Sequence, residues 1–178
     1  MLNKALTHRH DRSRAQAMTE FAIVAPILFF LLLGIVESGL LLCVVGSARF
    51  GGGEIARQES ESGNAVNADS ISIQQLQRTA IGTTTLAEVT EIDIYRLIEQ
   101  GNGSLLVDAL HYNRYQLNGT PIGAVMWPSS SRNVTNGQSD FLGVTLQYKY
   151  KWKTGIFIAP TAINLTQTFD IRLEPQTY

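Results

Sequence analysis

The pattern of apolar and polar positions divides the chain into one long apolar segment and a mixed segment that follows it. Residues 21–46 (FAIVAPILFFLLLGIVESGLLLCVVG) are apolar almost throughout, with Glu37 and Ser38 as the strongly polar exceptions. A run of 18 or more apolar residues is typical of a membrane-spanning helix. A helix of this length would reach about 39 Å, which exceeds the roughly 30 Å of a bilayer's hydrocarbon core. The pattern therefore predicts one membrane-spanning helix near the N-terminus.

Beyond residue 86 the pattern changes to the alternation that is typical of β-strands. The clearest strand is 142–152, where the apolar positions share one face: Leu142, Val144, Leu146, Tyr148, Tyr150 and Trp152. Such alternation predicts an antiparallel sheet with one buried face. Further strands are expected over 89–98, 105–117 and 165–173, with turns at 101–103 and 118–119. With a short helix inside 73–86, the fold class is α+β: a long N-terminal helix followed by an antiparallel sheet of about four strands.

Between helix and sheet, Gly51-Gly52-Gly53 is expected to act as a hinge, because each glycine costs a helix about 1 kcal/mol relative to alanine. A continuous helix that is locally soft is the alternative. Residues 60–70 are polar and predict a loop. We therefore expect three parts: a basic leader over 1–15, a transmembrane or assembly helix with a glycine hinge over 16–58, and an α+β domain over 59–178.

Charge predicts the orientation of the helix. The leader carries Lys4, Arg9, Arg12 and Arg14 against a single Asp11. By the positive-inside rule, the N-terminus lies in the cytoplasm, the helix crosses the inner membrane once, and the domain is extracytoplasmic. A cleaved secretory signal is the alternative, but the apolar run is longer than the 7–15-residue core of such a signal.

Composition narrows the possible functions. The net charge is −1 and no basic patch lies outside the leader, so nucleic acid is not an expected partner. The single cysteine, Cys43, cannot form a disulfide within the chain. No spacing of Cys and His predicts a metal site, and no constellation of residues predicts catalysis, a cofactor or a small-molecule substrate. The chain is therefore not expected to be an enzyme.

Two groups of strand residues have a structural and a functional interpretation. Tyr148, Tyr150 and Trp152 would suit a sugar-binding platform, but their alternation favours a core stripe. Glu91 and Asp93 lie on one face of a predicted strand, where a solvated edge is the expected role.

Glu20 stands at the membrane edge, where a carboxylate is tolerated. One interpretation is a first-turn acid favoured by the helix dipole, with Thr19 near the N-cap. The other is an assembly contact. If the chain were cut between Ala15 and Gln16, Glu20 would become the fifth residue of a new N-terminus. Its carboxylate could then attract the free amine of an adjacent subunit.

Inside the apolar run, Pro26 is expected to bend or loosen the helix, because it removes a backbone hydrogen bond. Gly34 and Ser38 form a small-x-x-x-small pair, which lets helices approach closely in lipid. Glu37 is an intramembrane acid and hence a functional candidate. We expect it to serve helix contact or extraction from the bilayer, unless a tilted helix brings it to the outer interface.

The segment RAQAMTEFAIVAPILFFLLLGIVESG resembles the N-terminus of TadE-like minor pilins (pseudopilins) of tight-adherence, Flp-type secretion systems. These proteins are similar to type IV prepilins: a basic leader, a peptidase site, a glutamate five residues later, and an apolar helix with an early proline. Glu20 and Pro26 match this pattern, and Gly34-x-x-Glu37 matches the internal G-x-x-E motif of the TadE-like family. Ala15 departs from the prepilin pattern, since glycine usually precedes the cut.

The resemblance implies a pilin-like fold and a filament subunit processed by a prepilin peptidase. Its partners would be other pilin subunits, an inner-membrane assembly platform and the lipid bilayer. The sequence therefore favours a minor pilin that takes part in assembling a surface filament for adhesion or secretion. The alternative is a permanently membrane-anchored extracytoplasmic binding module, which would need neither processing nor Glu20.

Overall fold

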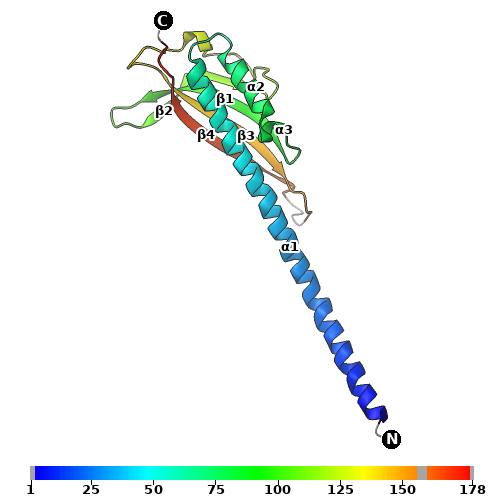
Figure 1. Ribbon diagram of the computed structural model, residues 1–178. Helices are drawn as coiled ribbons and strands as arrows, with labels where there is room; N and C mark the ends of the chain where they lie inside the picture. Colours follow the sequence, from blue (N-terminus) through cyan, green and yellow to red (C-terminus); the bar gives the residue numbers. More distant parts are fainter. Residues whose placement is uncertain (1–2, 156–159, 177–178) are drawn as a thin grey trace.

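In the computed structural model, residues 3–155 and 160–176 are described, with side chains from Arg14 onward. The dominant element is helix α1, Asn3–Ser62, which is 60 residues long. Its N-terminal part projects alone, and the remainder of the chain forms a domain around its C-terminal part (Figure 1). The two chain ends lie at opposite ends of the molecule.

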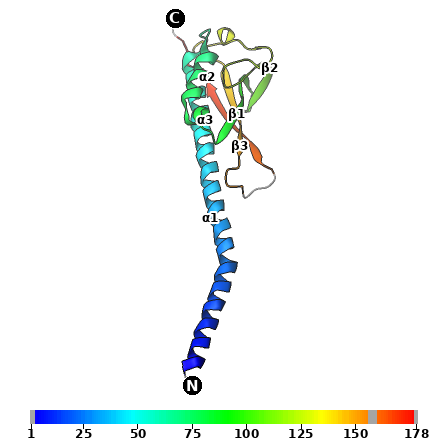
Figure 2. The same cartoon turned by 90° about the vertical axis from the view of Figure 1, so that its right-hand side faces the viewer.

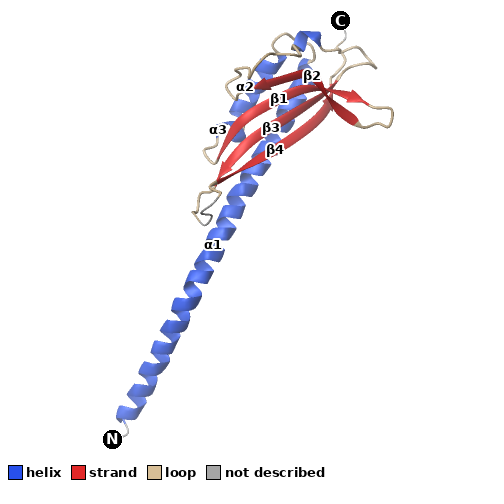
Figure 3. Cartoon of the chain, turned by 180° about the vertical axis from the view of Figure 1, so that it is seen from behind, coloured by secondary structure: helices blue, strands red, loops and turns tan. Residues whose placement is uncertain are grey.

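The domain contains a four-stranded antiparallel sheet in the order β2-β1-β3-β4 (Figure 3). The strands are β1 (Ala87–Glu99), β2 (Leu105–Tyr115), β3 (Phe141–Lys151) and β4 (Ala162–Arg172). The predicted fold class, α+β with a long N-terminal apolar helix and about four strands, is confirmed. The turns predicted at 101–103 and 118–119 join β1 to β2 and follow β2, and Gly103 and Gly119 adopt the positive φ angles that such turns require.

The helices cover one face of this sheet (Figure 2). Besides α1 they are α2 (Ala68–Arg78) and α3 (Ala80–Thr83), and a single 3₁₀ turn, η1 (Ser129–Ser131), lies in the β2–β3 connection. The apolar face of β3 is buried beneath the helices, as its alternation predicts, through Leu142, Val144, Leu146, Tyr148 and Tyr150. The core stripe is therefore confirmed, and Trp152 packs half-buried at its end.

The hinge predicted at residues 51–53 is not found, because α1 continues through these glycines to Ser62. Gly51 and Gly52 lie where the helix packs closely against the domain. A Cβ on Gly51 would come within 2.8 Å of Ile81, and a Cβ on Gly52 within 2.2 Å of the Phe169 ring. The glycines cost helix propensity but permit close packing, so they join the helix to the domain instead of loosening it.

The boundary predicted between residues 58 and 59 does not divide the structure either. Val44, Ala48 and Ile55 of α1 belong to the same buried cluster as the inner face of β3. The C-terminal third of α1 is thus a core element of the domain, and the sheet has no other long helix among the described residues to cover it.

This packing predicts opposite effects for two neighbouring substitutions. Gly52→Ala places a methyl group against Phe169 and is expected to destabilise the chain by about 1–3 kcal/mol. Gly53→Ala meets its nearest atom at 3.8 Å and is expected to stabilise it by up to about 1 kcal/mol through helix propensity. Urea denaturation of the detergent-solubilised protein measures both. Equal behaviour of the two variants would contradict the packing role of Gly52.

Candidate functional site

The N-terminal half of α1 presents apolar side chains that the chain itself leaves uncovered. Phe21, Phe30 and Ile35 are each more than 60% exposed. Among the described residues, α1 is the one helix long and apolar enough to cross a membrane. The exposed apolar surface needs an apolar environment, either lipid or other helices, and so it is the candidate functional surface.

The predicted cleavage and assembly residues lie at the base of this surface. Ala15 and Gln16 are consecutive residues of the unbroken helix α1. The Gln16 side-chain amide donates to the Glu20 carboxylate at 2.9 Å, and both side chains are exposed. The carboxylate is thus accessible to a partner, although its pairing with a neighbouring amine stays a prediction.

Pro26 lies within α1. The helix changes direction in its N-terminal half, the part that contains this proline (Figure 2). A bend there agrees with the missing backbone donor of proline.

Gly34 and Ser38 lie on a face of α1 that the domain does not cover. A Cβ added to Gly34 or Gly39 would meet no atom within 4 Å. The Ser38 hydroxyl donates to the Gly34 carbonyl at 2.9 Å, so its polarity is satisfied inside the helix. This small-residue face borders an apolar groove of about 940 Å³ that reaches Trp152. Its packing against a second helix stays a prediction.

Glu37 is buried although it lies in the apolar run of α1. Its side chain is 1% exposed and contacts the chain's own domain. The Tyr150 hydroxyl donates to the carboxylate, and so do the backbone N–H groups of Lys153, at 3.1 Å, and Thr154, at 2.7 Å. In this structure the carboxylate therefore forms a clasp between α1 and the end of β3. The role expected for Glu37, in helix contact or extraction from the bilayer, stays a prediction.

Sequence reasoning missed this clasp because the partners lie 113–117 residues away. Two of them are backbone N–H groups, which carry no residue signature. The available signal was physical: a carboxylate in an apolar run has to find donors.

A second buried polar cluster joins α1 to α2 at the far end of the domain. Arg132 is fully buried and donates to Glu59 of α1, at 2.5 Å, and to Asp69 of α2. Asp69 also accepts from Asn113 and from the Tyr115 hydroxyl. Burial and the neighbouring Asp69 carboxylate raise the pKa of Tyr115.

Arg132 lies in the polar segment between η1 and β3. Val134 of this segment joins the core, and the Arg132 guanidinium lies 4.7 Å from the centre of the Trp127 ring. Arginine in a loop carries no sequence signal for burial, so this cluster depends on the tertiary arrangement.

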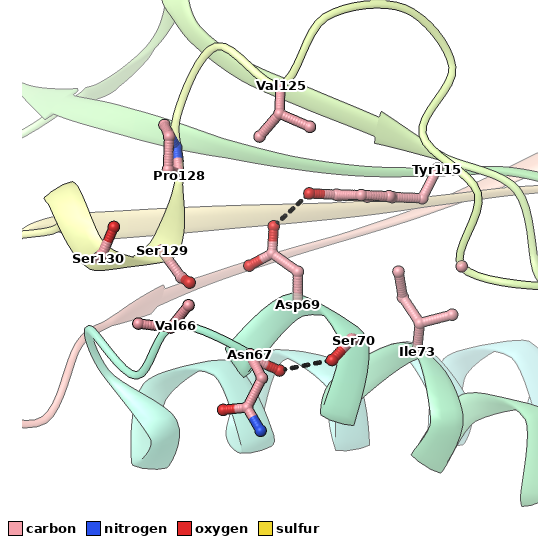
Figure 4. Close-up of a pocket in the computed structure, with 11 residues that line it drawn as sticks. Val66, Asn67, Asp69, Ser70, Ile73, Tyr115, Val125, Pro128, Ser129 and Ser130 are labelled. Carbon is pink, nitrogen blue, oxygen red and sulfur yellow. Dashed lines mark hydrogen bonds between the residues drawn. The ribbon is translucent and has the colours of Figure 1, made fainter.

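A pocket of about 330 Å³ adjoins the cluster (Figure 4). Asp69 points from α2 toward Tyr115 across the pocket, and Ser129 and Ser130 lie at its rim. Both Asp69 oxygens already accept hydrogen bonds from the protein. The Asp69 carboxylate, the most polar group in the pocket, therefore serves to stabilise the fold.

The expectation that Asp93 lies at a solvated edge is wrong. This residue lies on a central strand, is 1% exposed and accepts from Gln147 at 2.9 Å, so it is not a residue of a solvated edge. Burial raises the pKa of Asp93 to about 6. Glu91 beside it pairs with Arg114. Among the described residues, no group of three or more His, Cys, Asp and Glu side chains is arranged to hold a metal ion.

Fold and surface together define a class: an α+β domain built on the end of a helix whose other end supports membrane anchoring. The family model described as TadE-like protein matches residues 15–49. The match spans the predicted cleavage site, Glu20, Pro26, Gly34 and Glu37, so the resemblance to TadE-like proteins is confirmed over this segment, and it indicates involvement in Tad pilus systems. No curated protein and no solved structure gives a significant match to the chain.

Proposed function

We propose that this protein is a minor pilin (pseudopilin) that takes part in assembling a Tad-type surface filament used in adhesion or secretion. The observation that carries the proposal is the uncovered apolar half of α1, continuous with a helix that forms the core of the domain. A subunit of this shape can exchange lipid for neighbouring helices without exposing new apolar surface.

In the proposed sequence of events, the helix first resides in the inner membrane with the domain outside. A prepilin peptidase removes residues 1–15, and the new amine at Gln16 becomes available to Glu20 of an adjacent subunit. The assembly platform then moves the helix into a bundle. Close packing at Gly34 and Ser38 would hold the helices together, since contacts with lipid and with apolar side chains are nearly equivalent.

The N-terminus of the mature protein tests this proposal. We expect mass spectrometry of protein isolated from membranes to show the loss of residues 1–15. Glu20→Ala and Glu20→Gln should both reduce filament assembly at least about tenfold, as expected when an ion pair in a low-dielectric setting is lost.

Glu99→Ala is the matched control, because Glu99 is an exposed carboxylate at the end of β1. It should assemble normally. An intact N-terminus together with normal assembly of both Glu20 variants would contradict the proposal. That result would favour the anchored binding module, for which the pocket beside Asp69 would be the first place to look for a ligand.

A further inference from the structure

We propose that the end of the domain that holds Glu37 is a second membrane contact. In this proposal, Trp152, Lys151 and Lys153 lie in the lipid headgroup layer of the bilayer that α1 crosses. The inference rests on membrane anchoring of α1 and concerns the subunit before assembly. It does not require that the filament function be correct.

The first argument is the depth of Glu37. From Glu20 to Glu37 an α-helix rises about 26 Å, whereas the hydrocarbon core of a bilayer is about 30 Å thick. With Glu20 at one interface, an upright helix places Glu37 about 4 Å short of the opposite headgroup layer. Any tilt places it deeper. Whatever is bound to Glu37 must therefore reach this layer too.

The second argument is that the bound group is part of the domain. The carboxylate of Glu37 accepts from the backbone of Lys153 and Thr154 and from Tyr150, all at the end of β3. These donors also explain how a carboxylate is tolerated at this depth, because N–H groups replace its water. The domain cannot stand clear of the bilayer while this contact persists.

The third argument is that the apolar surface of α1 continues past Glu37. Leu42 is 70% exposed, although it lies beside the domain. The apolar groove along this part of the helix is lined by Ile35, Leu41 and Trp152, among others. A bilayer that ended below Glu37 would leave this surface in water.

The residues at this end suit a lipid interface. Trp152 packs edge-on against Tyr150, with ring centres 5.3 Å apart, and tryptophan is enriched at the headgroup level of membranes. Lys151 and Lys153 are exposed. Lys151 forms an exposed ion pair with Glu88, and Lys153 donates to the Thr85 carbonyl, so both ammonium groups lie at the surface, where they can meet phosphates.

A helix from a second copy could also fill the groove. The lipid interface is favoured because the helix-length argument applies to a single inserted chain, and because lysines suit phosphate groups better than an apolar helix. The two occupants respond differently to dilution in the membrane, since lipid contact persists when the protein is diluted and helix contact does not.

Tryptophan quenching by brominated lipids tests the proposal in vesicles that contain the full chain. The chain has one other tryptophan, Trp127, which is 1% exposed. It contacts Arg132, which binds Glu59. Glu59 lies about 33 Å along α1 from Glu37, so Trp127 is far from the proposed interface. Lipids brominated near the headgroup should quench up to about half of the emission, because one of the two tryptophans would lie at the interface. Trp152→Phe should abolish this loss. Equal emission with and without bromine would overturn the proposal.

A labelling pair gives an independent measurement. In a Cys43→Ser background, a spin label at Lys151→Cys should gain access to lipid-soluble oxygen when the protein is inserted in vesicles. A label at Asn102→Cys, in the turn at the opposite end of the sheet, should not. Identical accessibility at both sites would contradict the proposal. Quenching or oxygen access that appears only at high protein density would also contradict it, since it would assign the groove to a second helix.

Discussion

Replacing Arg132 with alanine is expected to destabilise the protein by about 3–5 kcal/mol, the largest effect of any single change considered for this chain. The guanidinium is fully buried between the carboxylates of Glu59 and Asp69. Without it, two acids of like charge would share a buried site without a counter-charge. The Trp127 ring would also lose the cation that lies 4.7 Å from its centre. Urea denaturation followed by circular dichroism measures the loss.

Arg114→Ala is the matched control for Arg132. Arg114 also pairs with a carboxylate, Glu91, but its side chain is 48% exposed. An exposed ion pair contributes about 0–1 kcal/mol, so this variant should remain close to the parent protein. If both arginine variants lose equal stability, the buried cluster is not what joins α1 to α2. A further check is Glu59→Gln combined with Arg132→Met. This pair of changes removes the like-charge repulsion between Glu59 and Asp69 together with the guanidinium, and should recover part of the loss.

Replacing Glu37 with alanine is expected to release the end of β3 from α1. The change leaves the Tyr150 hydroxyl and the backbone N–H groups of Lys153 and Thr154 without their acceptor. Hydrogen bonds to a charged group contribute about 1.5–3 kcal/mol each, and some of this is recovered when the freed groups meet water. We expect a local loss of about 2–3 kcal/mol, seen as roughly hundredfold faster exchange of these two amide hydrogens.

Two other variants separate the clasp from a general effect of removing a carboxylate. Glu37→Gln keeps one carbonyl acceptor and should show an intermediate loss of protection. Glu20→Ala removes a carboxylate from an exposed site on the same helix and should leave the exchange of Lys153 and Thr154 unchanged. Slow exchange at these amides in the Glu37→Ala variant would show that the clasp does not hold the end of β3.

These two clusters have a common mechanical consequence. Glu37 joins α1 to the end of β3, and Glu59 joins it to α2 and the β2–β3 connection. The close packing at residues 51–52 lies between them. The domain is therefore attached to α1 at three positions along the helix. A force or rotation applied to the N-terminal half of α1 would move the domain with the helix as one rigid body.

Local pattern was enough to predict the class of this protein. The nearly uninterrupted apolar run predicted the long helix, because a helix satisfies its own backbone hydrogen bonds in lipid. The alternation at 142–152 predicted the buried stripe of β3, since side chains alternate between the two faces of a strand. The spacing of Glu20, Pro26 and Gly34 was sufficient for the resemblance that the family match over residues 15–49 confirms.

The tertiary structure decided what local pattern could not. Glycine propensity predicted a hinge at residues 51–53, but packing against Phe169 and Ile81 outweighs the helix cost and keeps α1 continuous. Glu37 was predicted to be an intramembrane acid, and the sequence carries no signal that Arg132 is buried. Their partners come from remote segments, and some of them are backbone N–H groups, which leave no signal in the residue types of the sequence. The energy of a buried charge depends on which donors and acceptors surround it, and only the folded chain specifies them.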